Sequence, residues 1–217
     1  MPEGVIFDLD GVLVDTGPFH KQSWYDLAQK EDFQINDENF RSTFGMQNYE
    51  ILPIFTGRDL PQKEIERLSD WKEQRYRELV SGNLRLLEGV EYLIKNLKNK
   101  GFLLAVGTSA PKENLTLILD QLSLHDCFDA YVTCEDVTKS KPAPDTFIKS
   151  AQKLSLHPRR CIVVEDSVHG VQAAKAAGMK VVAVTNTRTR LNLAKADIIV
   201  DSLGQLQADD FIELLRS

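Results

Sequence analysis

The feature that most constrains the fold is a regular alternation of short apolar runs with longer segments of helical periodicity. The apolar runs are three to five residues long and rich in Val and Ile. They lie at 4–8, 102–106, 130–132, 161–164, 181–184 and 198–200. Helical spacing of apolar residues occurs at 89–99, 111–121, 144–153, 168–177 and 208–215. Strands that alternate with helices predict an α/β fold with a Rossmann-like parallel sheet, covered by helices on both faces.

One segment, residues 17–83, interrupts this alternation and has a different composition. It holds 10 of the 17 aromatic residues but only one of the sixteen valines. Within it, Trp24, Leu27 and Ala28 have the spacing of one helix face. Because strand-forming residues are scarce here, we expect a small all-helical cap domain inserted after the first strand. The expected division is an α/β catalytic core of residues 1–16 and 84–217 and a helical cap of residues 17–83.

The charge balance and the cysteines limit the partners and the compartment. The chain has 26 Lys and Arg against 32 Asp and Glu, a formal net charge of −6. This charge argues against a protein that binds nucleic acid through an extended basic surface. Three cysteines without CxxC spacing are typical of thiols in a reducing compartment. No apolar run approaches the ~20 residues that span a bilayer, and the first residues do not have the pattern of a signal peptide. We therefore expect a cytoplasmic monomer with no nucleic-acid or membrane partner.

Two polar motifs directly follow predicted strands, at the edge where parallel sheets bind their ligands. Asp8 and Asp10 follow the first strand, and an extended chain can point two such carboxylates to one side. Thr108 and Ser109 follow the second strand just before a helix, where hydroxyls and backbone N–H groups can hold an anion. Taken alone, the first motif also fits a strand-ending turn and the second a helix cap.

Two further motifs lie later in the chain. Lys141 is followed by Pro142, which favours an extended backbone at the lysine. Glu165 and Asp166 follow the strand predicted at 161–164, and carboxylate oxygens suit a hard cation. A surface lysine is usually only solvated and an acidic pair is often a helix cap, so the combination is more specific than either motif alone.

The order of these motifs resembles that of the haloacid dehalogenase-like hydrolase superfamily, and the resemblance covers essentially the whole chain. It implies that Asp8 is a nucleophile that forms an aspartyl-phosphate and that Asp10 is the general acid/base. It also implies that Thr108, Ser109 and Lys141 bind the phosphoryl group of a small phosphorylated substrate. The Mg²⁺ ligands implied by the resemblance are Asp8, Asp10, Glu165 and Asp166.

The charges of these residues support a metal independently of the resemblance. Four carboxylates facing a phosphate dianion would repel it, whereas one Mg²⁺ and one lysine change the charge of the site from about −4 to about −1. Asp8 can approach a phosphate only when a cation lies on both groups. Asp10 would protonate the leaving oxygen and then activate water. The sequence therefore predicts a Mg²⁺-dependent phosphatase.

The predicted cap bears on the substrate. The sequence around His20 resembles the β-phosphoglucomutase-like branch and its neighbouring sugar phosphatases, and His20 either faces the site or is an ordinary surface histidine. The mutase of this branch holds a second phosphate with basic cap residues, whereas the corresponding stretch 44–48 has no Lys or Arg. Gln47 and Asn48 are candidates for contacts with sugar hydroxyls, although a polar loop tip explains them equally well.

We therefore predict hydrolysis of sugar phosphates, with β-phosphoglucomutase activity as the alternative. Dehalogenation ranks below both because halide leaves without a proton or a metal, so Asp10 and the acidic pair would have no role. A non-catalytic binding protein would be expected to lack one of the key residues, and the sequence retains them all. Which phosphate ester is the substrate does not follow from the sequence.

Overall fold

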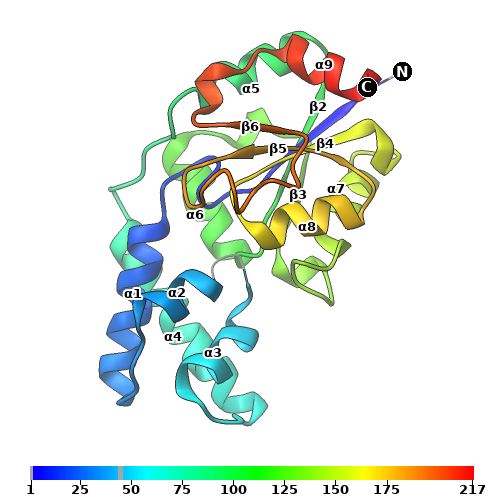
Figure 1. Ribbon diagram of the computed structural model, residues 1–217. Helices are drawn as coiled ribbons and strands as arrows, with labels where there is room; N and C mark the ends of the chain where they lie inside the picture. The colour runs from blue at the N-terminus through cyan, green and yellow to red at the C-terminus, as the bar shows by residue number, and fades with distance from the viewer. Residues whose placement is uncertain (1, 44–45) are drawn as a thin grey trace.

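The computed structural model describes residues 2–43 and 46–217, and its core is a six-stranded parallel sheet (Figure 1). The order across the sheet is β3-β2-β1-β4-β5-β6, and each neighbouring pair is parallel. β1 thus pairs with β2 on one side and β4 on the other, which makes its carboxyl end the switch point of the sheet. The strands are β1 (Gly4–Phe7), β2 (Leu103–Gly107), β3 (Ala130–Val132), β4 (Cys161–Glu165), β5 (Lys180–Val184) and β6 (Ile198–Val200).

Alternate residues of the strands pack against two different sets of helices. In β1, Val5 and Phe7 belong to one buried cluster, whereas Ile6 belongs to the other. The first cluster includes α5 (Val90–Asn99), α6 (Lys112–Leu122) and α9 (Ala208–Arg216). The second includes α7 (Asp145–Lys153) and α8 (Val168–Ala176). Each predicted strand and core helix is present within one or two residues, so the predicted sheet with helices on both faces is confirmed.

Of the five helices that the structure describes between β1 and β2, the first four form a separate layer at one end of the sheet (Figure 1). This helical layer consists of α1 (Gly17–Glu31), α2 (Asp37–Thr43), α3 (Asn48–Thr56) and α4 (Gln62–Val80). It has its own buried cluster, in which the rings of Trp24 and Phe55 meet edge to face at 5.1 Å. Among the described residues, no helix is both long and apolar enough to cross a bilayer. The segment is helical as expected, and its division from the core at residues 17 and 83 stays a prediction.

The two connections between the helical layer and the sheet run side by side. Val14 forms β-bridges with Asp10 and with Leu86, and the Leu87 N–H donates to the Leu13 carbonyl at 3.0 Å. Both connections therefore lie beside the carboxyl end of β1. This arrangement fixes the helical layer next to the residues that follow β1.

Candidate active site

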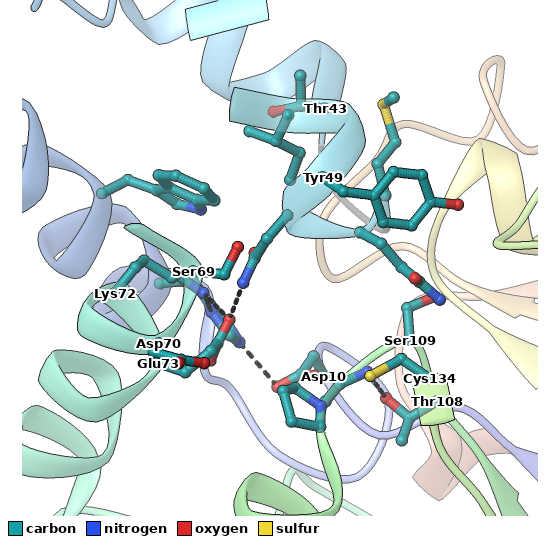
Figure 2. A pocket seen from close by; sticks show the side chains of 18 of the residues that line it. Asp10, Thr43, Tyr49, Ser69, Asp70, Lys72, Glu73, Thr108, Ser109 and Cys134 are labelled. Carbon is teal, nitrogen blue, oxygen red and sulfur yellow. Dashed lines mark hydrogen bonds and ion pairs between the residues drawn. The ribbon is translucent and has the colours of Figure 1, made fainter. Parts of the chain in front are cut away.

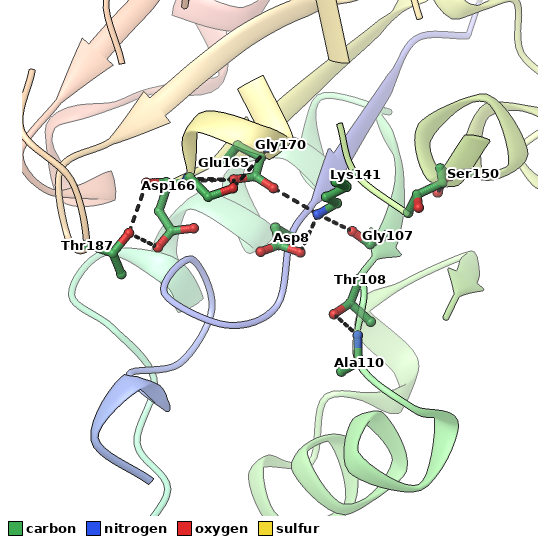
Figure 3. Close-up of polar contacts among 12 residues, drawn as sticks. Asp8, Gly107, Thr108, Ala110, Lys141, Ser150, Glu165, Asp166, Gly170 and Thr187 are labelled. Atoms are coloured by element: carbon green, nitrogen blue, oxygen red, sulfur yellow. Dashed lines mark hydrogen bonds and ion pairs between the residues drawn. The ribbon is translucent and has the colours of Figure 1, made fainter. Parts of the chain in front are cut away.

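The polar motifs predicted from the sequence meet at the carboxyl edge of the sheet (Figure 3). Asp8 follows β1, Thr108 follows β2, and Glu165 is the last residue of β4. Lys141 reaches the same point from the loop between β3 and α7. Its Nζ donates to Asp8 Oδ1 at 2.7 Å and to Glu165 Oε1 at 2.8 Å. Residues far apart in the sequence therefore form one charged group.

Lys141 is a buried cation, with only 1% of its surface exposed. Its third contact is the Gly107 carbonyl, at 3.2 Å. Burial by itself would lower the pKa of Lys141, but the charges of Asp8 and Glu165 and their hydrogen bonds raise it above its ordinary value. A buried charge needs such partners, so the lysine stays protonated and holds Asp8 in place.

Asp8, Glu165 and Asp166 form a compact buried group in which one oxygen of each lies within 4.8 Å of the others. Burial raises the pKa of Asp8 to about 7, despite the opposing charge of Lys141. Burial and the neighbouring carboxylates also raise the pKa of Asp166 well above its ordinary value. Asp166 Oδ2 accepts from Thr187 Oγ1 at 2.5 Å, whereas Oδ1 is buried without a partner among the described residues. Crowded carboxylates and an unpartnered oxygen fit a divalent cation with oxygen ligands.

Two glycines leave room for this acidic group. A Cβ on Gly11, whose φ is +80°, would lie 2.0 Å from Asp166 Oδ2. A Cβ on Gly170 would lie 1.7 Å from Glu165 Oε1. Glu165 Oε2 is in turn fixed by the backbone N–H groups of Asp166 and Ser167, at 2.8 and 2.7 Å. Any larger residue at position 170 would therefore displace a carboxylate that the backbone holds in place.

Thr108 and Ser109 lie on the other side of Asp8, between β2 and α6. Thr108 Oγ1 accepts from the Ala110 N–H at 3.0 Å. The Ser109 hydroxyl is buried and has no partner among the described residues. A buried hydroxyl without a partner is suited to donate to an anionic oxygen. Both residues line the same cavity as Asp8, and their role in phosphate binding stays a prediction.

The carboxylate of Asp10 is directed toward the helical layer. Its Oδ1 accepts a short hydrogen bond from Thr16 Oγ1 and lies 3.3 Å from His20 Nε2. Burial by itself would raise the pKa of Asp10, but the charge of His20 and the hydrogen bonds from His20 and Thr16 lower it. The ionised form suits a general base. Asp10 is not among the three acids that lie close enough for one ion, so its predicted role as a metal ligand stays a prediction.

A cavity of about 690 Å³ lies over these residues and is lined by both the core and the helical layer. Its apolar lining includes Trp24, Phe40 and Tyr49. The three predicted cap residues, His20, Gln47 and Asn48, all line it. Phe44 and Gly45, which belong to the stretch compared with the mutase, lie outside the described residues.

Residues 5–184 match the family model described as haloacid dehalogenase-like hydrolase. The chain belongs to this family. β-Phosphoglucomutase of Bacillus subtilis is 31% identical over 211 residues, which cover 94% of this chain and 91% of that protein. Hexitol phosphatase B of Escherichia coli is 30% identical over 215 residues, which cover 95% of each. The crystal structure of β-phosphoglucomutase from Clostridium difficile matches with a TM-score of 0.91 at 29% identity, covering 100% of this chain and 98% of that chain.

The similar proteins of this family include a phosphatase and a phosphoglucomutase, and the sequence comparison of these two activities concerned basic residues of the helical layer. There the structure brings in a cation that the sequence comparison overlooked. Lys72 Nζ lies 2.9 Å from His20 Nδ1 and donates to Glu73 Oε1 at 2.8 Å (Figure 2). The available signal was a lysine between Leu68 and Tyr76 at the spacing of a buried helix face.

Glu73 is the second residue that sequence reasoning missed. Besides Lys72, its carboxylate accepts from Asn48 Nδ2 at 2.8 Å and from Asn114 Nδ2 at 2.6 Å. Burial by itself would raise the pKa of Glu73, but the charges of Lys72 and His20 and the hydrogen bonds lower it to about 2. A continuous set of contacts therefore runs from Asp10 through His20 and Lys72 to Glu73.

Proposed function

We propose that this protein is a Mg²⁺-dependent phosphatase of small phosphorylated carbohydrates that acts through an aspartyl-phosphate on Asp8. The observation that carries the proposal is the position of Asp8 beside the cavity, where it contacts the cation of Lys141 and lies within 4.8 Å of carboxylate oxygens of Glu165 and Asp166. Membership of a hydrolase family and similarity to a hexitol phosphatase support the same reaction class, a phosphoric monoester hydrolase.

The first step is attack of an Asp8 carboxylate oxygen on phosphorus. The ammonium of Lys141 would neutralise a phosphoryl oxygen while it holds Asp8 in place, and the Ser109 hydroxyl would donate to another. Asp8, Glu165 and Asp166 would hold Mg²⁺, which when bound neutralises charge between the carboxylates and the phosphoryl oxygens. Phosphoryl transfer needs mainly such positioning and neutralisation.

The proton transfers fall to Asp10. In its acid form, Asp10 would donate a proton to the leaving oxygen, and in its base form it would take one from the water that hydrolyses the aspartyl-phosphate. Its contacts with Thr16 and His20 orient the carboxylate toward the helical layer, where the leaving group would lie. His20 is thereby a positioning residue for Asp10.

Water, rather than a second sugar phosphate, is the proposed acceptor. A mutase has to hold a second phosphate in the helical layer, which requires available cations. Here Lys72 is paired with Glu73, and Arg77 donates to Asn114 Oδ1 at 3.0 Å. Of the two cations on this side of the described lining, Lys72 is therefore neutralised by a carboxylate, and Arg77 is held by a neutral amide.

The test is release of phosphate from a panel of sugar and polyol phosphates, with Mg²⁺ and after its removal by chelation. Chelation should abolish release, and Asp8→Asn should lower it about 1,000-fold or more because the nucleophile is lost. Full activity of Asp8→Asn would exclude the proposed nucleophile. Conversion of β-glucose 1-phosphate to glucose 6-phosphate, primed by glucose 1,6-bisphosphate, would instead identify the mutase.

A further inference from the structure

The side of the cavity formed by α4 is rich in carboxylates. Positions 66, 70 and 73 are spaced by four and three residues, so their side chains share one face of the helix. The cations of α4 that line the cavity are Lys72 and Arg77. Carboxylates therefore exceed cations in this part of the described lining. The carboxylates in this part of the lining are Glu66, Asp70 and Glu73 of α4 together with Glu113 and Glu135 of the core.

Lys72 is the cation that would otherwise attract a second anionic group of a substrate. It is 2% exposed, and its Nζ contacts His20 and Glu73 at 2.9 and 2.8 Å. The charge of the lysine is thus matched by one carboxylate of the protein. Without that carboxylate, a nearly buried ammonium would face the cavity and favour any ligand that brings a negative charge.

Glu73 is held where its charge acts with little screening by water. It is 6% exposed, and side chains from three elements donate to it: Lys72 of α4, Asn48 of α3 and Asn114 of α6. Asn114 also accepts a hydrogen bond from Arg77 Nη1 at 3.0 Å. The side-chain amide of Asn114 thus connects Glu73 with Arg77. The position of Glu73 is fixed by both the helical layer and the core.

We propose that Glu73 is a specificity-determining residue that restricts the enzyme to phosphate esters whose leaving group carries no second anionic group. This inference rests on the proposed phosphatase function. Monophosphates of sugars and polyols satisfy the restriction, whereas a bisphosphate or a phosphorylated sugar acid brings a second negative charge toward the carboxylate of Glu73. The same arrangement disfavours a mutase cycle, which requires a bisphosphate in the cavity.

The sharpest test uses two substrates that differ by one charge. Sorbitol 6-phosphate and 6-phosphogluconate share the scissile ester and differ only at C1, a hydroxymethyl group in one and a carboxylate in the other. The wild type should prefer sorbitol 6-phosphate in kcat/KM, and Glu73→Gln should shift the ratio toward 6-phosphogluconate by about tenfold or more. A merely structural role would lower both values by the same factor, because both substrates use Asp8 and Asp10.

Asp70→Asn is the matched control, since it removes a carboxylate from the same helix face but leaves the pair of Lys72 and Glu73 intact. Asp70 is exposed, so water and salt screen its charge and the ratio should change by no more than about twofold. A shift as large as that of Glu73→Gln would assign the preference to general acidity and overturn the proposal.

A second variant covers the case in which Glu73→Gln fails to fold. Lys72→Met leaves the carboxylate of Glu73 unopposed, so the relative kcat/KM for 6-phosphogluconate should fall below that of the wild type. An unchanged or higher ratio would overturn the proposal.

The failure of this inference can be told from the failure of the proposed function. Wild-type protein that releases no phosphate from any ester in the presence of Mg²⁺ would refute the phosphatase itself. Turnover without a preference between the two substrates would refute only the role of Glu73, and so would a ratio that Glu73→Gln leaves unchanged.

Discussion

The carboxyl edge of the sheet and the helical layer both place buried charges at the cavity, but they do so by different means. At the sheet edge, Asp8, Thr108 and Glu165 are placed by the register of neighbouring strands, and Lys141 pairs with two acids at once. In the helical layer, Lys72 and Glu73 are neighbours in sequence and pair with each other. The sheet edge therefore keeps an excess of carboxylates for a cation, whereas the helical pair is internally neutral.

This difference indicates that the sheet edge and the pair of Lys72 and Glu73 have different roles. The sheet edge retains carboxylate charge and an Asp166 oxygen that has no partner within the described part of the chain, and both suit the binding of a metal and a phosphoryl group. The pair of Lys72 and Glu73 is internally neutral, and the role proposed for its carboxylate is to restrict which substrates are accepted. Substitutions at the sheet edge should therefore reduce the rate for every substrate, and substitution of Glu73 should change stability and selectivity.

Apart from loss of the nucleophile itself, the largest effect should come from Lys141→Met at the sheet edge. The loss of this cation leaves Asp8 and Glu165 without their shared partner and removes a donor for the phosphoryl group, so we expect kcat to fall about 100- to 1,000-fold for all substrates. Phosphate release under saturating Mg²⁺ measures the change. Lys153→Met, which removes a half-exposed lysine from α7, is the control and should stay within about twofold. A fall confined to one substrate would contradict the proposed difference in roles.

A smaller effect is expected from Gly170→Ala, which acts on the acidic group without removing any charge. The added methyl group would lie 1.7 Å from Glu165 Oε1, so the carboxylate has to move. Glu165 is a proposed Mg²⁺ ligand, and changes to residues that support a metal ligand typically cost about 10- to 100-fold in metal affinity or activity. Titration of activity with Mg²⁺ should show a higher half-saturating concentration. Gly204→Ala, whose Cβ would find its nearest neighbour at 3.4 Å, should behave like the wild type.

A third prediction concerns the pH dependence of stability and tests the carboxylate of Glu73. The pKa of Glu73 is lowered from its ordinary value of 4.5 to about 2, so its stabilisation is complete above pH 4.5 and is lost as the pH falls toward 2. The contribution at neutral pH is on the order of 3 kcal/mol. Urea unfolding of Glu73→Gln should show lower stability at pH 7 and a weaker decline below pH 4.5 than the wild type. Parallel curves for the two proteins would show that Glu73 is not held as an ion.

Much of the core site could be predicted because each residue follows a pattern that is readable locally. Asp8 and Thr108 come directly after apolar runs, and parallel strands bring their carboxyl ends to one edge whatever the details of packing. The unpartnered oxygen of Asp166 and the need for glycine at position 170 could not be predicted. Both depend on side-chain positions across α8 and the neighbouring loops, which have no periodic signature.

By itself, the sequence determined the alternation of strands and helices, the helical character of residues 17–83 and the set of polar residues at the sheet edge. These features follow from periods of two and 3.6 residues and from the composition of short segments. Only the tertiary structure decided that Lys72 meets His20, 52 positions earlier in the chain, and that Glu73 neutralises the lysine. Such contacts depend on how α1 and α4 pack together, because helical spacing shows which face is buried but not what lies opposite it.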